Sequence, residues 1–417
     1  MPLKEPIALL VFCMAFGLGW GQPHLPKTDT TETAEATAWH IPEHSDAFSR
    51  LWCLMDSIQA QEPAALSVLY IGGSHVQAGW LGHTLRRNLH EWAPHLERSR
   101  GMHLPYRIAN TNTPTHFRTE YEGTWNAHRC TRGVGKDHCT HAPLATGILV
   151  EPSGPTRIQH VAYYPDSTSA STRSLEIWTD APPSMWQWDG NIPLQRIEPL
   201  SDSTGWLLHL NASTDTLALR FDVPEGTTVW YAGMHPVTNN PSSLTVNEWG
   251  HNGCRISHVA EAKGWEAFIE RLDPDLVFIG VGLNDAVQGP HLNMDAFASH
   301  YTPWIERIRS SGTAVVLLGN TPGSYKGQSL AAPNAQIEAF FESCSESLGV
   351  GYMNLTDAMA ARGNVQTWEA NGWLKTDGLH YTKEGYTQIA ELIYQAWMAS
   401  YSASKNNASL NPQASDE

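Results

Sequence analysis

The sequence is poor in basic residues and in long apolar runs. Its 417 residues include 26 Lys and Arg against 42 Asp and Glu, a net charge of −16. Nucleic acid and anionic membrane surfaces repel so acidic a chain, so we expect neither as a partner. Outside residues 7–18, no apolar stretch is long enough to span a bilayer. With these classes excluded, the length predicts a globular protein of two or three domains.

Cysteine is also scarce, with six in the chain. Cys130 and Cys139 bracket a glycine-containing loop, and in an oxidising compartment we expect them to form a disulfide. The cysteine spacings match no common zinc pattern, so we expect no metal and no cofactor. Nearby histidines nevertheless leave a metal site open: His128, His138 and His141. The cysteines without an expected partner are Cys53, Cys254 and Cys344.

The apolar run at residues 7–18 predicts export. Lys4 precedes the run and a short Gly-Trp-Gly segment follows it, so we expect a signal peptide over residues 1–21 and a periplasmic or secreted protein. The run is too short for a good transmembrane helix, although an uncleaved anchor stays open as the alternative. Residues 22–43, rich in Thr, Ala and Pro towards their start, are expected to be a linker.

Helical and strand patterns alternate at both ends of the chain. This alternation predicts an α/β domain with a parallel sheet and right-handed crossovers, made of residues 44–104 and 237–402. We expect residues 403–417 to be a disordered tail. The helices are expected over 44–61, 80–92, 256–272, 297–310, 336–347 and 383 to about 400, and the strands over 66–71, 276–281, 314–319 and 350–353.

Between the two parts, residues 105–236 show little helical periodicity. Short β-type runs recur instead, among them 147–151 and 158–164, and polar turn clusters separate them. Strands at this spacing are typical of a β-sandwich. We therefore expect an all-β sandwich domain inserted into the α/β domain.

Polar residues of catalytic type follow the expected strands. Ser74 lies in Gly-Gly-Ser-His (72–75), after the strand at 66–71, and Asn284 lies in Gly-Leu-Asn-Asp (282–285), after the strand at 276–281. Asp377 and His380 lie in Asp-Gly-Leu-His, just before the last helix. A nucleophilic hydroxyl needs a base, the base needs an orienting carboxylate, and the oxyanion needs donors. Each block alone is common, and the information lies in their order and strand context.

Together with Asn252-Gly253, these blocks resemble the SGNH/GDSL hydrolase superfamily of esterases and acyl hydrolases. The resemblance implies a flavodoxin-like three-layer domain in which Ser74 is the nucleophile, His380 the general base and Asp377 its orienting carboxylate. It also implies an oxyanion hole formed by the Ser74 amide, the Gly253 amide and the Asn284 side chain. A sandwich inserted between the Ser and Gly blocks is similar to the layout of exported bacterial peptidoglycan O-acetylesterases.

One position departs from the family pattern. Gly73 stands where the family usually has Asp, which is not the triad carboxylate. With the export signal, the sandwich and seventeen tryptophans, the resemblance favours hydrolysis of O-acetyl groups on a polysaccharide. The alternatives are an O-acetyltransferase with the same triad, a generic esterase acting on small esters, and a non-catalytic carbohydrate-binding protein.

Overall fold

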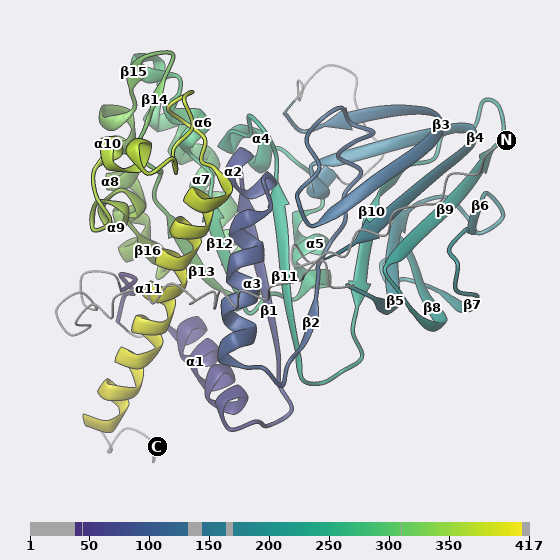
Figure 1. Cartoon of the computed structure of the whole chain (residues 1–417), viewed down its shortest axis with the longest axis horizontal. Coiled ribbons are helices and arrows are strands. Elements are labelled where there is room, and N and C mark those ends of the chain that lie inside the picture. Colours follow the sequence, from purple (N-terminus) through teal and green to yellow (C-terminus); the bar gives the residue numbers. More distant parts are fainter. Residues whose placement is uncertain (1–37, 44, 132–143, 164–169, 310, 411–417) are drawn as a thin grey trace, which may run out of the picture.

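The computed structural model describes residues 38–43, 45–131, 144–163, 170–309 and 311–410, and Figure 1 shows their arrangement. A parallel sheet forms the centre of the α/β part, as predicted, with strand order β16-β13-β12-β1-β11-β2. Its strands are β1 (Ala65–Gly72), β2 (Glu97–Ser99), β11 (Ser243–Gly250), β12 (Leu276–Gly280), β13 (Ala314–Leu318) and β16 (Gly351–Met353).

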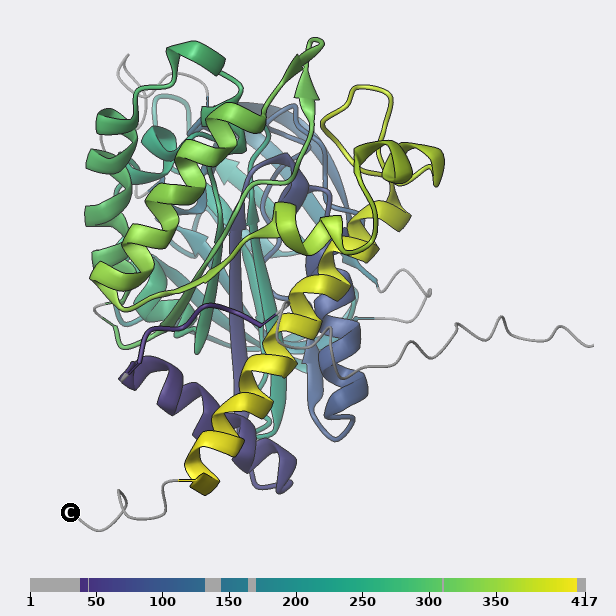
Figure 2. The ribbon, with the colours of Figure 1, turned by 90° about the vertical axis from the view of Figure 1, so that its left-hand side faces the viewer.

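Helices cover both faces of this sheet and make the predicted three layers. Along β1, Val68 and Tyr70 join one buried cluster while Leu69 and Ile71 join the other, as the two-residue period of a strand requires. Figure 2 shows α11 crossing one face. On that face lie α1 (Asp46–Gln59), α3 (Trp80–Trp92), α9 (Leu355–Ala360), α10 (Val365–Ala370) and α11 (Lys383–Leu410). The other face carries α4 (Ile256–Ala260), α5 (Trp265–Leu272), α7 (Met294–Arg309) and α8 (Ala331–Leu348).

Short elements lie in the connections between the longer helices and strands. They are α2 (Ser74–Gln77), α6 (Leu283–Ala286), the 3₁₀ helices η2 (Leu144–Thr146) and η3 (Gly289–His291), and the paired strands β14 (Ser324–Tyr325) and β15 (Gln328–Ser329).

The predicted all-β insertion is confirmed as an antiparallel, eight-stranded sheet. The sheet is curled, as contacts between strands near its two ends show. The rings of Trp186 and Trp206 lie 6.3 Å apart, and both indole N–H groups donate to the Ala181 carbonyl. The strands are β3 (Phe117–Arg129), β4 (Ile148–Ala162), β5 (Thr172–Thr179), β6 (Trp186–Trp188), β7 (Leu194–Pro199), β8 (Gly205–Thr214), β9 (Thr216–Val223) and β10 (Tyr231–Val237).

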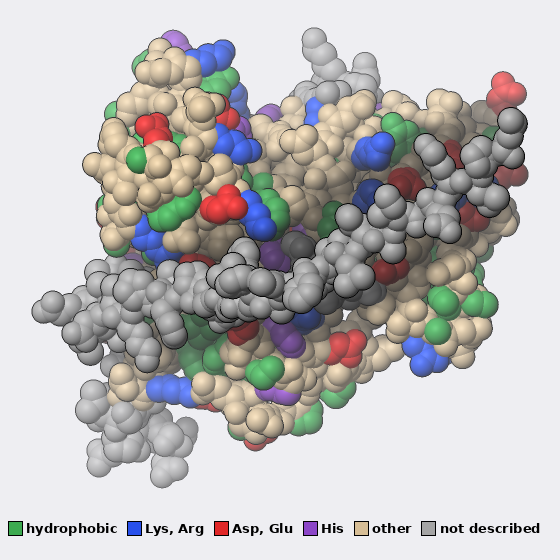
Figure 3. Space-filling model, viewed as in Figure 1, with side chains coloured by type: hydrophobic (Ala, Val, Ile, Leu, Met, Phe, Trp, Pro, Cys, Tyr) green, Lys and Arg blue, Asp and Glu red, His purple; other side chains and the backbone are tan. Residues whose placement is uncertain are grey.

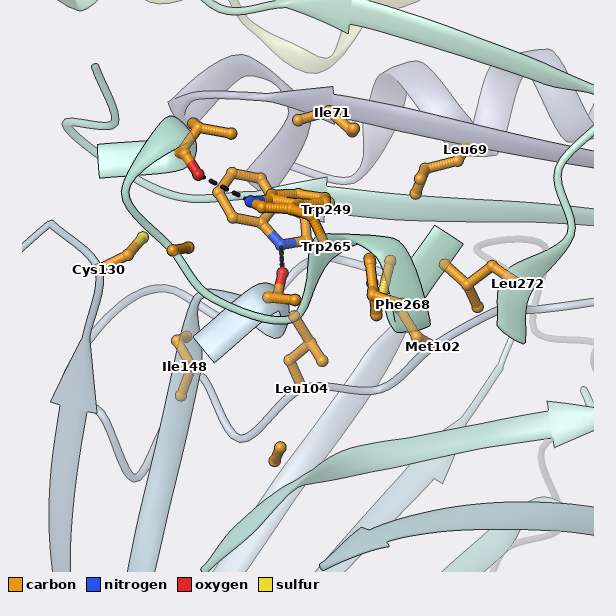
Figure 4. Close-up of a cluster of buried hydrophobic side chains, with 14 of the residues drawn as sticks. Leu69, Ile71, Met102, Leu104, Cys130, Ile148, Trp249, Trp265, Phe268 and Leu272 are labelled. Atoms are coloured by element: carbon orange, nitrogen blue, oxygen red, sulfur yellow. Dashed lines mark hydrogen bonds between the residues drawn. The ribbon is translucent and has the colours of Figure 1, made fainter. Parts of the chain in front are cut away.

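The insertion and the parallel sheet share one hydrophobic core (Figure 4). Trp249 of β11 and Trp265 of α5 are fully buried with ring centroids 5.4 Å apart, and Ile148 of β4 belongs to the same cluster. Trp249 Nε1 donates to the Ala145 carbonyl at 2.6 Å. A buried indole N–H needs such a partner, so this bond fixes η2 against the sheet.

Two details of the predicted elements are wrong. The helix over 256–272 is broken into α4 and α5, because Gly264 adopts φ 84°, a left-handed conformation that favours glycine. The runs at 147–151 and 158–164 are parts of the single strand β4, since its polar middle pairs on both sides, with β3 and β9.

The prediction of a disordered tail from residue 403 is also wrong as far as residue 410, because α11 continues to Leu410. Lys405 Nζ lies 2.8 Å from Asp56 Oδ1 and 2.7 Å from Gln59 Oε1, and these contacts fasten the added turns to α1. Residues 411–417 lie outside the described residues, as do residues 1–37, where the signal peptide and most of the linker are predicted. The division into domains at 104/105 and 236/237 stays a prediction.

Acidic and basic side chains are interspersed on the face shown in Figure 3, with no broad area of one sign. Within the described ranges, no helix has both the length and the apolar character that crossing a membrane requires.

We predict that Gly250→Ala destabilises the protein while Gly280→Ala does not. Both glycines pair with Gly72, one on each side. A methyl group on Gly250 would lie 2.2 Å from the backbone nitrogen of Gln77, whereas one on Gly280 would make only ordinary contacts from 3.5 Å. Overpacking typically costs about 1–3 kcal/mol. Denaturant unfolding of the two variants checks this, and equal stabilities would contradict it.

Candidate active site

Ser74 lies directly after the central strand of the parallel sheet. Strand β1 ends at Gly72, and Ser74 begins the short helix α2. Its Oγ lies 2.9 Å from Nε2 of His380, which is 306 residues further along the chain. The structure therefore brings together the hydroxyl and the imidazole that the sequence predicted as nucleophile and base.

The Asp377–His380 segment is a tight loop closed by a hydrogen bond from the Lys375 amide to the His380 carbonyl at 2.8 Å. Gly378 adopts φ 70°, and a methyl group there would lie 2.5 Å from Ser324 Oγ, so the loop requires glycine at this position. The loop also holds the carboxylate beside the imidazole, because His380 Nδ1 lies 2.8 Å from Asp377 Oδ2.

Hydrogen bonds keep Asp377 ionised. Burial opposes its charge, but Oδ1 accepts the backbone N–H groups of His380 at 2.9 Å and Leu379 at 3.0 Å, and the net effect lowers the pKa of Asp377 to about 2. An ionised carboxylate only accepts, so His380 Nδ1 carries a proton. In the neutral ring Nε2 is then the acceptor that faces the Ser74 hydroxyl.

The loops of the predicted oxyanion donors lie beside Ser74, because β11 and β12 flank β1 in the sheet. The amide of His251 donates to the Gly72 carbonyl at 3.1 Å, which holds the loop of Gly253 against the nucleophile turn. A methyl group on Gly73 would lie 2.9 Å from Asn284 Nδ2, so the Asn284 amide faces this residue. The glycine in place of the family Asp thus leaves room for Asn284.

Sequence reasoning missed His75, a neighbour of the base. Its Nε2 lies 3.1 Å from the Leu379 carbonyl, and its ring lies 5.8 Å from that of His380. Burial and the nearby His380 lower the pKa of His75 to about 3, so the ring is neutral and Nε2–H donates to the carbonyl. His75 therefore supports the loop that carries His380. Its position directly after Ser74 was the one available signal.

Sequence reasoning also missed Gln77 and Asp285, which connect loops distant in the sequence. The buried Gln77 accepts from the Asn252 amide at 2.5 Å. Asp285 Oδ2 accepts from the amide of Ile256 at 3.1 Å, which ties the Asn284 block to the start of α4. No spacing rule predicts such contacts.

The predicted disulfide and the open metal site both involve residues outside the described ranges. Cys130 is a buried free thiol hydrogen-bonded to Cys254, while its expected partner Cys139 lies outside the described residues. The part of the chain that the structure describes contains no group of three or more His, Cys, Asp or Glu side chains arranged to hold a metal ion. His138 and His141 are not in that part.

Comparison with known proteins relates part of the chain to a family of hydrolases. Residues 221–388, which include Asn284, Asp377 and His380, match the model of the GDSL-like lipase/acylhydrolase family. The match covers less than half of the chain, and over these residues the chain is similar to GDSL-like lipases and acylhydrolases. No curated protein matches its sequence.

Solved structures extend the likeness of the SGNH hydrolase fold to the insertion. A structure of a peptidoglycan O-acetylesterase has a TM-score of 0.66 at 17% identity, over 86% of this chain and 97% of that chain. Two further structures match smaller shares of the chain. The esterase EstA from Pseudoalteromonas sp. has a TM-score of 0.30 at 16% identity, over 38% of this chain and 78% of that chain. A lipase/acylhydrolase from Enterococcus faecalis has a TM-score of 0.32 at 21% identity, over 38% of this chain and 76% of that chain. The first match shows that the fold with its inserted β module occurs in another protein.

We predict that Asp285→Asn reduces the dependence of stability on pH. Burial raises the pKa of Asp285 to about 7, while hydrogen bonding and Arg255 lower it only in part. Since the unfolded value is about 4, the folded state binds the proton more tightly, and the free energy of unfolding decreases as pH rises from about 4 to 7. Asn keeps an acceptor for Ile256 but does not titrate.

Urea unfolding of wild type and Asp285→Asn at pH 5 and pH 8 checks this prediction. Burial also raises the pKa of Glu248 to about 7 and that of Asp275 to about 6, so both contribute in the same direction in either protein. The difference between the two proteins therefore isolates Asp285. An identical change in stability between the two pH values would contradict the assignment.

Proposed function

We propose that the protein is an exported serine esterase that hydrolyses ester groups, O-acetyl groups above all, on a polysaccharide such as peptidoglycan. The observation that carries the proposal is the continuous hydrogen-bonded series from Ser74 Oγ through His380 to Asp377, at 2.9 and 2.8 Å. A series of this kind activates a serine hydroxyl at neutral pH without a metal.

The proposed reaction begins at Ser74. Its Oγ attacks the ester carbonyl carbon while its proton moves to His380 Nε2, and Asp377 stabilises the imidazolium. The carbonyl oxygen becomes an oxyanion that accepts from the Ser74 amide, the Gly253 amide and Asn284 Nδ2. His380 then protonates the leaving sugar oxygen. Water, deprotonated by the same histidine, hydrolyses the acyl-enzyme and releases the acid.

The choice of substrate rests on the inserted module. One solved structure whose match also spans the insertion is that of a peptidoglycan O-acetylesterase. The apolar run at residues 7–18 supports export to the compartment where such polymers occur. The intact Ser, His and Asp series disfavours a purely carbohydrate-binding role. An O-acetyltransferase would use the same residues with a sugar hydroxyl in place of water.

Ser74→Ala tests the proposed function. We predict that it abolishes acetate release from both a small aryl acetate and an O-acetylated cell-wall polymer, because the substitution removes the attacking hydroxyl. The ratio of the two wild-type rates separates a polymer-directed enzyme from a generic esterase. Acetate release that persists in the variant would contradict the proposal. Acetyl transfer by the wild-type protein to an added glycan would show that the protein is a transferase and not a hydrolase.

Asn284→Ala tests the oxyanion assignment. Removing one side-chain donor to the oxyanion is expected to lower kcat by about 10²–10³, with a smaller effect on KM, because the interaction strengthens as charge develops. Steady-state kinetics on the aryl acetate measures both constants. An unchanged kcat in a folded variant would exclude Asn284 from this role.

A further inference from the structure

Gln77 is a polar side chain buried between three segments. It ends α2, three residues after Ser74, and only 1% of it is exposed. Its Oε1 accepts from the Asn252 amide at 2.5 Å. Its Nε2 donates to Thr111 Oγ1 at 2.9 Å and to the Asn112 carbonyl at 2.5 Å. The nucleophile turn, the loop of Gly253 and the segment that leads into the insertion therefore meet at one amide.

The loop of Gly253 is held on one side by the His251 amide, which donates to the Gly72 carbonyl, and it is closed by the Cys254 amide, which donates to the His251 carbonyl at 3.0 Å. Gly253 itself adopts φ 77°, and a methyl group on it would meet nothing within 4 Å among the described residues beyond its two chain neighbours. The preceding residue, Asn252, is fixed through its amide by Gln77 and through Nδ2 by Thr111 Oγ1 at 3.3 Å. The peptide that carries the Gly253 N–H is therefore oriented by the His251–Cys254 turn together with the anchorage of Asn252.

We propose that Gln77 is a positioning residue for the oxyanion hole. It sets the position of the Gly253 amide relative to Ser74 Oγ. Through its bonds to residues 111 and 112, it also connects the segment that leads into the insertion with these two groups. The inference rests on the proposed function, because it assigns the Gly253 amide to the oxyanion. A displacement of about 1 Å at such a donor can lower the rate by about 10².

Gln77→Met and Gln77→Glu test the inference on the full chain. Met preserves the volume but removes both hydrogen-bonding functions, so we expect kcat on an aryl acetate to fall about 10–100-fold while KM changes by less than about threefold. The control is Ser345→Ala in α8, which removes a buried hydrogen bond from Ser345 Oγ to the Val350 carbonyl and should leave kcat unchanged.

The Gln77→Glu variant provides a readout that loss of packing would not change. The introduced carboxyl group keeps an acceptor for the Asn252 amide in either protonation state, but it can donate to residues 111–112 only when it is protonated. The ratio of variant to wild-type kcat should therefore increase as pH falls. A pH-independent ratio would contradict the inference.

Hydrogen exchange supplies a measurement that does not depend on turnover. In Gln77→Met, the amides of residues 252–254 should exchange faster than in wild type by more than the change in global stability accounts for, because the Asn252 amide has lost its acceptor. Unchanged kcat, or an equal loss in Ser345→Ala, would overturn the inference. Should Gln77→Met fail to fold, Thr111→Val decides, because it removes the acceptor shared by Gln77 Nε2 and Asn252 Nδ2. The expected kcat decrease is at least about two- to tenfold, the worth of one such hydrogen bond; an unchanged kcat overturns the inference.

The two proposals fail in different ways. Wild type without Ser74-dependent turnover would overturn the proposed function, and the inference about Gln77 with it. Normal wild-type turnover together with normal Gln77→Met turnover would overturn the inference alone.

Discussion

The register of three neighbouring strands is the constraint on which the site depends. Gly72 at the end of β1 pairs with Gly250 of β11 on one side and Gly280 of β12 on the other. In a parallel sheet the carboxyl ends of neighbouring strands lie at one edge, where ligands usually bind. The loops of Ser74, Gly253 and Asn284 therefore start at the same level. Small residues at this edge also let α2 approach β11 closely.

The insertion contributes to the arrangement of the site as well as to its surroundings. Trp249, in the strand that leads to the Gly253 loop, donates to Ala145, and His251 in that loop lies within hydrogen-bond distance, 2.9 Å, of the Thr146 carbonyl. Both acceptors belong to η2 of the inserted module. Because these contacts continue the shared core shown in Figure 4, the loop of Gly253 is supported from both parts of the chain.

The alternating pattern predicted the three-layer domain and the inserted β module because each apolar strand is bounded by turn residues. The same strand ends allowed Ser74 and Asn284 to be selected in advance, and the position just before the last helix did so for Asp377 and His380. Gln77 could not be selected, since the contact that makes it informative is with Asn252, 175 residues away in the sequence. The break at Gly264 was missed because apolar periodicity continues across it, and strand β2 because Glu97–Ser99 is short and polar.

Covalent capture of the nucleophile tests the central claim most directly. A p-nitrophenyl phosphonate transfers its phosphonyl group to an activated serine and forms a stable tetrahedral adduct that resembles the first intermediate. The account predicts a single adduct, mapped by peptide mass spectrometry to Ser74 and formed far more slowly in His380→Ala. No adduct on the wild-type protein, or an adduct on another residue, would contradict it.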